Sequence, residues 1–404
     1  MVFGNLVVLD LSQVFAGPLA TRLFAELGAT VIKVERPTGD ISRQLPWRLG
    51  GRSGYFVQQN RGKLGAALDL STDAGAQLLW SLIDHADVLV DGFAPGVLAG
   101  FGFSREALMQ RNTRLVLCEL SAMGRSGVLG TLRGYDAIGA SFAGVAYTSS
   151  TITNPPAMPS VAMGDAMMGI CAYGGIVTAL YQREHTGKGQ LVDVSLVDAY
   201  IQSHSNNLEN YSLSGGTVDA RRVSGHNASV CPSGVWRAPG DTWIYIVALS
   251  NQEWVRICAC IGRPELANDP DFRTNEARVA HRDDVVKLLQ DWIDSCGDRD
   301  TAVDRFLAGG VPAAPVLSIG EVIAQPHLLE RGTVEIVTDE VLGSFAVPGP
   351  PFRLSGAPRA DIAPAPGLGE HNRQVFEDYA GVSAETVAAC EAAGILVSRA
   401  GDGG

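Results

Sequence analysis

The sequence has no excess of basic residues. Its 404 residues include 31 Lys and Arg against 43 Asp and Glu, which gives a formal net charge of −12. Proteins that bind nucleic acids or anionic membranes take most of their affinity from a basic surface. We therefore expect neither nucleic acid nor membrane as a partner. A local basic pocket for a phosphate-bearing small ligand remains compatible with this composition.

Signals for secretion and membrane insertion are also lacking. The N-terminus, MVFGNLVVLDLS, has no basic segment and carries an acid at Asp10, so it predicts a first strand and not a signal peptide. No uncharged apolar run approaches the ~20 residues that span a bilayer. We expect a cytoplasmic protein.

Cysteines are few, odd in number and scattered. There are 7 of them, and without a secretory signal this pattern predicts reduced thiols. Cys258 and Cys260 form the one close pair, and no second pair follows at zinc-ligand spacing. We therefore expect no metal site.

Strand-like and helix-like segments alternate over the first 120 residues. Short apolar runs predict buried strands at 6–10, 30–35, 88–91, 115–120 and 191–195. Helices are expected at 19–27, 74–85, 135–148, 165–184 and 196–211, the second with Asp73 as its N-cap. Strands separated by helices predict an α/β fold with a doubly wound, Rossmann-like parallel sheet.

The pattern changes near Gly215. Two antiparallel strands are expected at 234–237 and 243–248, with helices at 252–260, 283–296 and 299–308 and a last helix at 383–393. We predict a large α/β domain over 1–215, a smaller α+β domain over 220–325, and a return segment over 330–404 that completes the large domain.

Asp165 stands where a loop meets the helix predicted at 165–184. One interpretation is an N-cap, since Asp is among the best acceptors for the free N–H groups of a helix start. The other is chemical: a carboxylate kept ionised by the helix N-terminus can attack an activated carbonyl. Local spacing leaves both open and favours the cap. Gly169, Gly174 and Gly175 lie in the same helix and suggest close packing.

Several ordered segments resemble the family III CoA-transferases, which include formyl-CoA and carnitine CoA-transferases and the related α-methylacyl-CoA racemases. They are VLDLSQVFAGPLATRLFAELGATVIKVERPTGD, NRGK, ALDLS, ADVLVDGFAPG, GYDAIGASFAG, GDAMMGICAYGGIVTALYQREHTGKGQLVDVSL and LGEHNRQV. The resemblance covers nearly the whole chain. It implies that Asp165 is the nucleophile, forming an aspartyl anhydride and then an aspartyl-CoA thioester.

The resemblance also implies a coenzyme A site. The residues it assigns to CoA are Val14, Ala16, Arg36, Leu68, Leu70, Gly92, Phe93, Arg133 and Tyr135. Phe15 and His226 are assigned to the substrate. A basic side chain at His226 or Arg222 would favour a dicarboxylic acid, and succinyl-CoA is a common donor in the family.

The sequence departs from the family at three points. Ala99 and Gly100 stand where an Arg is frequent, so a phosphate contact is either missing or supplied by Arg61 or Lys63. The glycine-rich mobile loop corresponds to residues 224–234, with only two glycines. Tyr135 replaces the His that racemases need as an acid–base group, and a phenol with a pKa near ~10 exchanges protons poorly at neutral pH.

Transfer is therefore favoured over the racemase alternative. Two further possibilities stay open: the active subunit of a heteromeric CoA-transferase, and a non-catalytic CoA-binding protein. By the same resemblance we expect a ring-like chain in an interlocked homodimer, to which the long segments 200–232 and 334–366 are suited.

Overall fold

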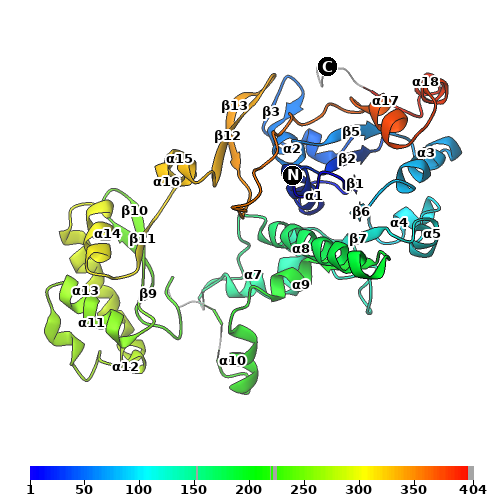
Figure 1. Ribbon diagram of the computed structural model, residues 1–404. Coiled ribbons are helices and arrows are strands. Elements are labelled where there is room, and N and C mark those ends of the chain that lie inside the picture. The colour runs from blue at the N-terminus through cyan, green and yellow to red at the C-terminus, as the bar shows by residue number, and fades with distance from the viewer. Residues whose placement is uncertain (152, 219, 222–224, 399–404) are drawn as a thin grey trace. The chain divides into compact units, whose positions relative to one another are not determined.

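The computed structural model describes residues 1–151, 153–218, 220–221 and 225–398 (Figure 1). Contacts divide the chain into two units. The first unit contains Met1–Ala143, Ser160–Ser203 and Leu329–Gly404, and the second contains Gly144–Pro159 and His204–Leu328. The chain thus leaves the first unit and later returns to it.

The first unit is built on a six-stranded sheet in the order β5-β2-β1-β6-β7-β8, in which every neighbouring pair is parallel. Its strands are β1 (Val7–Leu11), β2 (Thr30–Glu35), β5 (Leu64–Ala67), β6 (Val88–Asp91), β7 (Val116–Ser121) and β8 (Leu191–Ser195). Two small antiparallel pairs join β3 (Arg48–Leu49) with β4 (Arg52–Ser53) and β12 (Val334–Asp339) with β13 (Gly343–Pro348).

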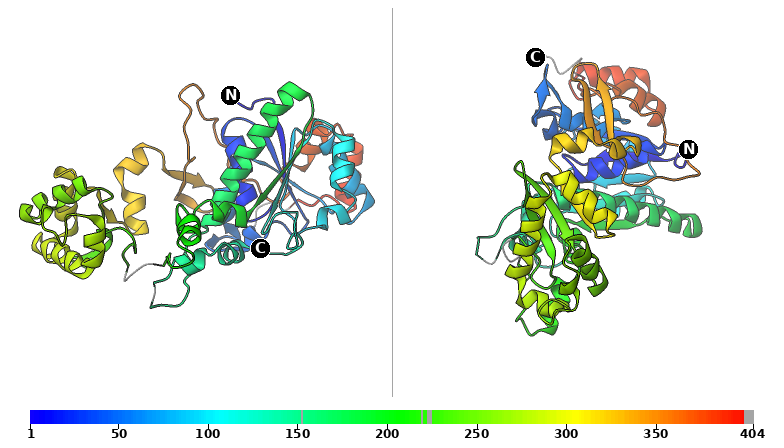
Figure 2. Two further views of the ribbon diagram at one scale, coloured as in Figure 1. Left: turned by 90° about the horizontal axis from the view of Figure 1, so that it is seen from below. Right: turned by 90° about the vertical axis from the view of Figure 1, so that its left-hand side faces the viewer.

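Helices cover both faces of the sheet (Figure 2). They are α1 (Ala16–Glu26), α2 (Gly54–Asn60), α3 (Asp73–Ile83), α4 (Val97–Gly100), α5 (Arg105–Arg111), α6 (Asp136–Phe142), α8 (Met163–Thr186), α9 (Leu196–Ile201), α17 (Asn372–Gln374) and α18 (Ala384–Ala392), with a 3₁₀ turn at Ile41–Gln44 and a π-helical turn at Val375–Tyr379.

Successive side chains along each strand point to opposite faces of the sheet, which explains why helices pack on both faces. In β1, Val8 packs with α1, α8 and α9 on one face, whereas Leu9 packs with α3, α5 and the C-terminal helices on the other. Both side chains are fully buried. The prediction of a doubly wound parallel sheet is confirmed.

The second unit has its own core around the antiparallel sheet β11-β10-β9. Its elements are β9 (Ser233–Ala238), β10 (Thr242–Val247), β11 (Ala313–Val316), α7 (Val145–Thr148), α10 (Asn207–Leu213), α11 (Asn251–Cys260), α12 (Asn275–Ala280), α13 (Arg282–Ser295), α14 (Arg299–Ala308) and α15 (Ile319–Ala324), with a 3₁₀ turn at Pro264–Ala267. The remaining helix is α16 (Pro326–Glu330).

Local details differ from the sequence predictions at three places. Thr72, not Asp73, caps α3, because the Thr72 hydroxyl accepts from the Gly75 N–H. The helix expected over 135–148 is divided into α6 and α7 by Gly144, whose φ is 77°. The helix expected over 196–211 is likewise divided into α9 and α10.

The long helix α8 is apolar enough to fit a membrane span by length and composition, and it is the one such helix in the described part of the chain. A single helix of this kind is weak support for a membrane protein, because core helices have the same composition. Here α8 packs against α1 and the sheet. Among the described residues, no group of three or more His, Cys, Asp or Glu side chains is arranged to hold a metal ion.

Candidate active site

The order of the strands indicates where a ligand binds in the first unit. From β1 the chain runs outward through β2 to β5, and it then returns to build β6, β7 and β8 on the opposite side of β1. In open parallel sheets, ligands bind at the carboxyl ends of the strands where the direction of winding reverses. In this sheet that position lies between the ends of β1 and β6.

A cavity of about 480 Å³ lies at this position. Its walls come from the segments that follow β1, β6 and β7, from the loop that enters α6, and from the first turns of α8 and α9: residues 12–17, 92–95, 120–122, 132–135, Arg36, Ile41, Asp165, Met168 and Leu196. A cavity of this size suits a small-molecule ligand.

Two glycines allow the loops below the cavity to pack closely. A Cβ at Gly17 would lie 2.1 Å from Ser12 Oγ, and a Cβ at Gly92 would lie 2.8 Å from Ser12 Cα. A third glycine, Gly169, brings α8 against α1, since its Cβ would lie 2.7 Å from the Ala16 carbonyl oxygen. These contacts hold the N-terminal ends of α1 and α8 beside one cavity.

Asp165 lies in the first turn of α8 and lines the cavity. The helix begins one turn earlier than an N-cap at Asp165 would require: its N-cap is Ala162, and no side chain caps it. The capping interpretation is therefore wrong. No described residue donates a hydrogen bond to the half-buried Asp165 carboxylate, which leaves its oxygens available for a ligand.

A second carboxylate fixes the backbone of Asp165. Asp136 Oδ1 accepts from the Asp165 N–H at 2.9 Å, and both Asp136 oxygens accept from the buried Tyr200 hydroxyl at 2.9 and 2.8 Å. Gly164 makes room for this arrangement, since a Cβ there would lie 2.1 Å from the Tyr200 ring. Burial, and then the hydrogen bond to Asp136, raise the pKa of Tyr200 to about 12, so the phenol stays a donor.

The ionisation of Asp165 differs from the sequence expectation. A helix N-terminus lowers the pKa of a carboxyl, but burial here raises the pKa of Asp165 to about 7, and the charge of Asp136 contributes to the rise. Such a shift, at a cavity wall with a specific charged neighbour, is typical of functional sites. The carboxyl is therefore partly protonated near neutral pH and becomes a full carboxylate above it.

Most residues assigned from the sequence come together at this cavity. Val14, Phe15, Ala16, Arg36, Gly92, Phe93, Arg133, Tyr135 and Asp165 all line it. Leu68 and Leu70 do not: Leu68 is buried in the core below the sheet, where it pairs with Leu396, and Leu70 packs against the same core. Sequence reasoning missed Asp136 and Tyr200, because no local pattern marks a contact between residues 64 positions apart.

His226 lies in the second unit and is not exposed as a loop histidine would be. It is 7% exposed, and the centroid of its ring lies 4.6 Å from the centroid of the Trp236 ring. A Cβ at Gly234 would lie 2.1 Å from the His226 Nδ1. Burial lowers its pKa. These contacts are those of a core side chain. Arg222 lies outside the described residues.

Arg61 and Lys63 were alternatives for a missing phosphate contact, and the structure contradicts this suggestion. Both are buried away from the cavity and already paired. Arg61 lies 3.2 Å from Glu26, and Lys63 lies 2.8 Å from Asp10. Arg36 and Arg133, in contrast, are exposed at the cavity.

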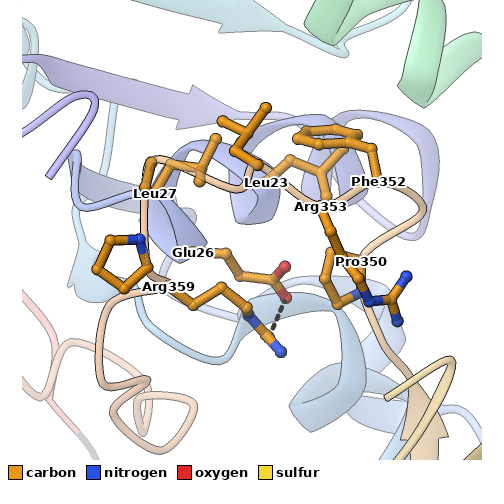
Figure 3. Close-up of a pocket in the computed structure, with 10 residues that line it drawn as sticks. Leu23, Glu26, Leu27, Pro350, Phe352, Arg353 and Arg359 are labelled. Carbon is orange, nitrogen blue, oxygen red and sulfur yellow. Dashed lines mark ion pairs between the residues drawn. The ribbon is translucent and has the colours of Figure 1, made fainter. Parts of the chain in front are cut away.

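A second hollow of about 240 Å³ lies against α1, on the side of residues 350–359 (Figure 3). Its one carboxylate, Glu26, points toward Arg359 in Figure 3 and lies 3.2 Å from it. Arg22 and Arg61 pair with the same oxygen at 3.5 and 3.2 Å. Three guanidinium groups thus lie against one oxygen of this carboxylate, which leaves it a poor nucleophile. The cavity with Asp165 is the better candidate for acyl chemistry.

Comparison with known proteins agrees with this geometry. The family described as CoA-transferase family III matches residues 4–372. Succinyl-CoA:glutarate CoA-transferase of Mus musculus is 32% identical over 375 residues, covering 92% of this chain and 85% of that protein. Formyl-CoA:oxalate CoA-transferase of Streptomyces avermitilis is 32% identical over 405 residues, covering 96% of this chain and 98% of that protein.

A solved structure supports the same relationship. The crystal structure of a CAIB/BAIF family protein from Brucella suis aligns with a TM-score of 0.81 and 28% identity, covering 93% of this chain and 98% of that one. The fold and the site together define an α/β enzyme with a carboxylate beside the point where the winding of its sheet reverses. The chain belongs to CoA-transferase family III.

Proposed function

We propose that this enzyme transfers CoA between two carboxylic acids through covalent intermediates on Asp165. The observation that carries the proposal is the Asp165 carboxylate, which faces the cavity with no hydrogen-bond donor of its own among the described residues. An unpaired, half-buried carboxylate with a pKa raised to about 7 is a stronger nucleophile than a solvated one.

Each step exchanges one bond for another. An Asp165 oxygen attacks the donor thioester, the C–S bond breaks, and CoA leaves as a thiolate from a mixed anhydride. The thiolate then attacks the aspartyl carbonyl carbon, the anhydride C–O bond breaks, and the donor acid departs, leaving an aspartyl-CoA thioester. The acceptor carboxylate repeats both steps in reverse and restores Asp165. Acyl activation is kept throughout, provided that water is excluded.

The residues around the cavity fit the remaining requirements. Ala16 and Gly17 begin α1, and their N–H groups have no acceptor among the described residues, so they can bind an anion or an oxyanion. Arg36 and Arg133 suit the phosphates of CoA, because guanidinium groups bind phosphate oxygens in pairs. Val14, Gly92, Phe93 and Tyr135 form the walls around the pantetheine and acyl groups in this proposal.

Racemase activity is the second candidate function, and Tyr135 argues against it. It is 78% exposed at the start of α6. Among the described residues that line the cavity there is no histidine, so the acid–base group that would exchange an α-proton is lacking. Transfer requires only the nucleophile and bound CoA.

The donor, the assembly and the location belong to the proposal as well. We propose succinyl-CoA or another small acyl-CoA as donor and a carboxylic acid as acceptor. We also propose that the enzyme is cytoplasmic, and that it forms an interlocked homodimer or is the active subunit of a heteromer.

The activity is tested by combining a set of CoA donors with a set of acid acceptors and identifying the products by mass spectrometry. New acyl-CoA that depends on both substrates supports transfer. Deuterium uptake at the α-carbon without an acceptor supports the racemase instead.

We expect the pH dependence of transfer to follow Asp165. Only the carboxylate attacks, so kcat/KM should rise with pH up to about 7, where this raised pKa lies, and level off above it. Asp136→Asn removes the charge that helps to raise the pKa, so its profile should shift to lower pH. The CoA phosphates titrate equally in both experiments, so a difference between the two pH profiles reports on Asp165. Superimposable profiles would contradict the assignment.

Arg133→Ala should weaken acyl-CoA binding more than it slows the reaction. We expect KM for acyl-CoA to rise about tenfold, with kcat changed little, because a charge-assisted contact to phosphate is worth roughly 1.5–3 kcal/mol at most. Arg114→Ala is the control, since Arg114 is exposed outside the cavity. A fall in kcat at constant KM would place Arg133 in the chemical step instead.

A further inference from the structure

Val14 has a backbone conformation that its side chain disfavours. Its φ is 67°, and only one other residue that is not glycine, Asp241, has a positive φ among the described residues. For a β-branched residue this left-handed conformation is a true outlier, which persists only where the surroundings impose it. Val14 also lines the proposed CoA cavity. The contacts that keep Val14 in this conformation therefore bear on the shape of the cavity.

One buried carboxylate binds the backbone of Val14. The Val14 N–H donates to the two oxygens of Asp40, at 3.3 and 3.4 Å. Asp40 belongs to the segment after β2, whereas Val14 belongs to the turn after β1. Arg36 and Ile41, on either side of Asp40 in sequence, line the same cavity. Asp40 thus joins two of the segments that form the cavity wall.

Asp40 is itself held rigidly. Its Oδ2 lies 2.9 Å from the Lys33 ammonium group, and both side chains are fully buried. Lys33 also donates to the Ser12 carbonyl oxygen, two residues before Val14. Asp40 Oδ1 accepts from the Ser42 N–H and hydroxyl, each at 2.8 Å. The carboxylate cannot turn away from Val14 without losing several charge-assisted hydrogen bonds.

We propose that Asp40, supported by Lys33, is a positioning residue for the acyl-CoA site: it holds Val14 in the left-handed conformation that shapes the CoA-facing turn. This inference rests on the proposed function, because it assumes that CoA lies against Val14. Asp40 touches neither CoA nor the reacting atoms in this account. It acts through the backbone of Val14.

A double-mutant cycle with Val14→Gly tests the proposal. Glycine adopts φ near 67° without strain, so the turn in the Val14→Gly variant needs the Asp40 anchor less. Asp40→Ala alone should raise the Kd for CoA, measured calorimetrically, about tenfold, equivalent to roughly 1.4 kcal/mol. Asp40→Ala in the Val14→Gly background should raise it by less than about threefold.

Melting temperature separates positioning from general destabilisation. Asp40→Ala should lower the melting temperature in both backgrounds, because Lys33 loses its partner in each, whereas CoA affinity recovers only with Val14→Gly. If the single variant does not fold, Lys33→Met with Asp40→Ala removes both charges and is compared in the same two backgrounds. Ser42→Ala is the matched control: it removes another hydrogen bond of Asp40 but leaves the acceptor of Val14 in place.

Three results would overturn the inference. They are an equal rise in Kd in both backgrounds, no rise in either, and a rise with Ser42→Ala as large as with Asp40→Ala. If the unaltered enzyme binds no CoA, the proposed function fails and this inference with it. If it binds CoA and the cycle shows no coupling, only the inference fails.

Discussion

Asp165→Asn is expected to reduce CoA transfer by on the order of 10⁴-fold or more, the range found when an enzyme loses its nucleophile. The amide has the shape of the carboxylate but cannot form the anhydride. The measurement is steady-state formation of the new acyl-CoA. Binding of CoA should persist, since Asp165 is proposed to act on the thioester and not to hold the nucleotide.

Asp136→Asn is the matched control for this experiment. It alters a carboxylate whose oxygen lies 2.9 Å from the Asp165 N–H, yet it should retain most of the activity above pH 7. Asp165→Asn should not lower the melting temperature, because the burial that raises the pKa of Asp165 makes its ionised form costly to the folded state. Substantial transfer by the Asp165 variant would contradict the proposed nucleophile.

The largest effect on stability is expected from Asp10→Ala. Asp10 is fully buried in β1 and lies 2.8 Å from Lys63. Burial alone would raise the pKa of Asp10, but the charges of Lys33 and Lys63 hold that pKa well below its usual range. Removing one member of a buried ion pair costs about 3–5 kcal/mol, because the remaining charge stays without its partner. Chemical denaturation of the whole chain measures the change.

Asp84→Ala is the comparison for Asp10→Ala. It breaks an exposed ion pair with Arg111 at 2.6 Å, and exposed pairs contribute about 0–1 kcal/mol. The two variants therefore remove the same side chain from an ion pair, one buried and one exposed. If both shift the denaturation midpoint equally, Asp10 is not the buried anchor that its contacts indicate.

The strands could be predicted where apolar residues run without interruption. β1, β2, β6, β7 and β8 were expected within one residue at each end. The first four are almost entirely buried, as such runs predict, whereas the edge strand β8 is mostly exposed or half-buried. β5 was not expected, because three of the four residues of Leu64–Ala67 are Gly or Ala and show no strand-like pattern. The hairpin of β12 and β13 was also missed, in a segment interpreted as a long connection.

The site residues could be predicted only where the order of several motifs along the chain resembled a known family. Local spacing suggested that Asp165 was a helix cap, and resemblance to a family reversed this interpretation. The residues that act on Asp165 and Val14 could not be found in this way. Asp136, Tyr200 and Asp40 reach their partners across 29, 64 and 26 positions, and such contacts exist only once the sheet has formed.

Trapping the covalent intermediate tests the central claim most directly. The enzyme is incubated with an acyl-CoA donor that it uses, reduced with borohydride, digested and analysed by mass spectrometry. The account predicts that Asp165 is reduced to the alcohol side chain of homoserine, only when donor is present and not in Asp165→Asn. No modification during turnover, or modification of a different carboxylate, would contradict it.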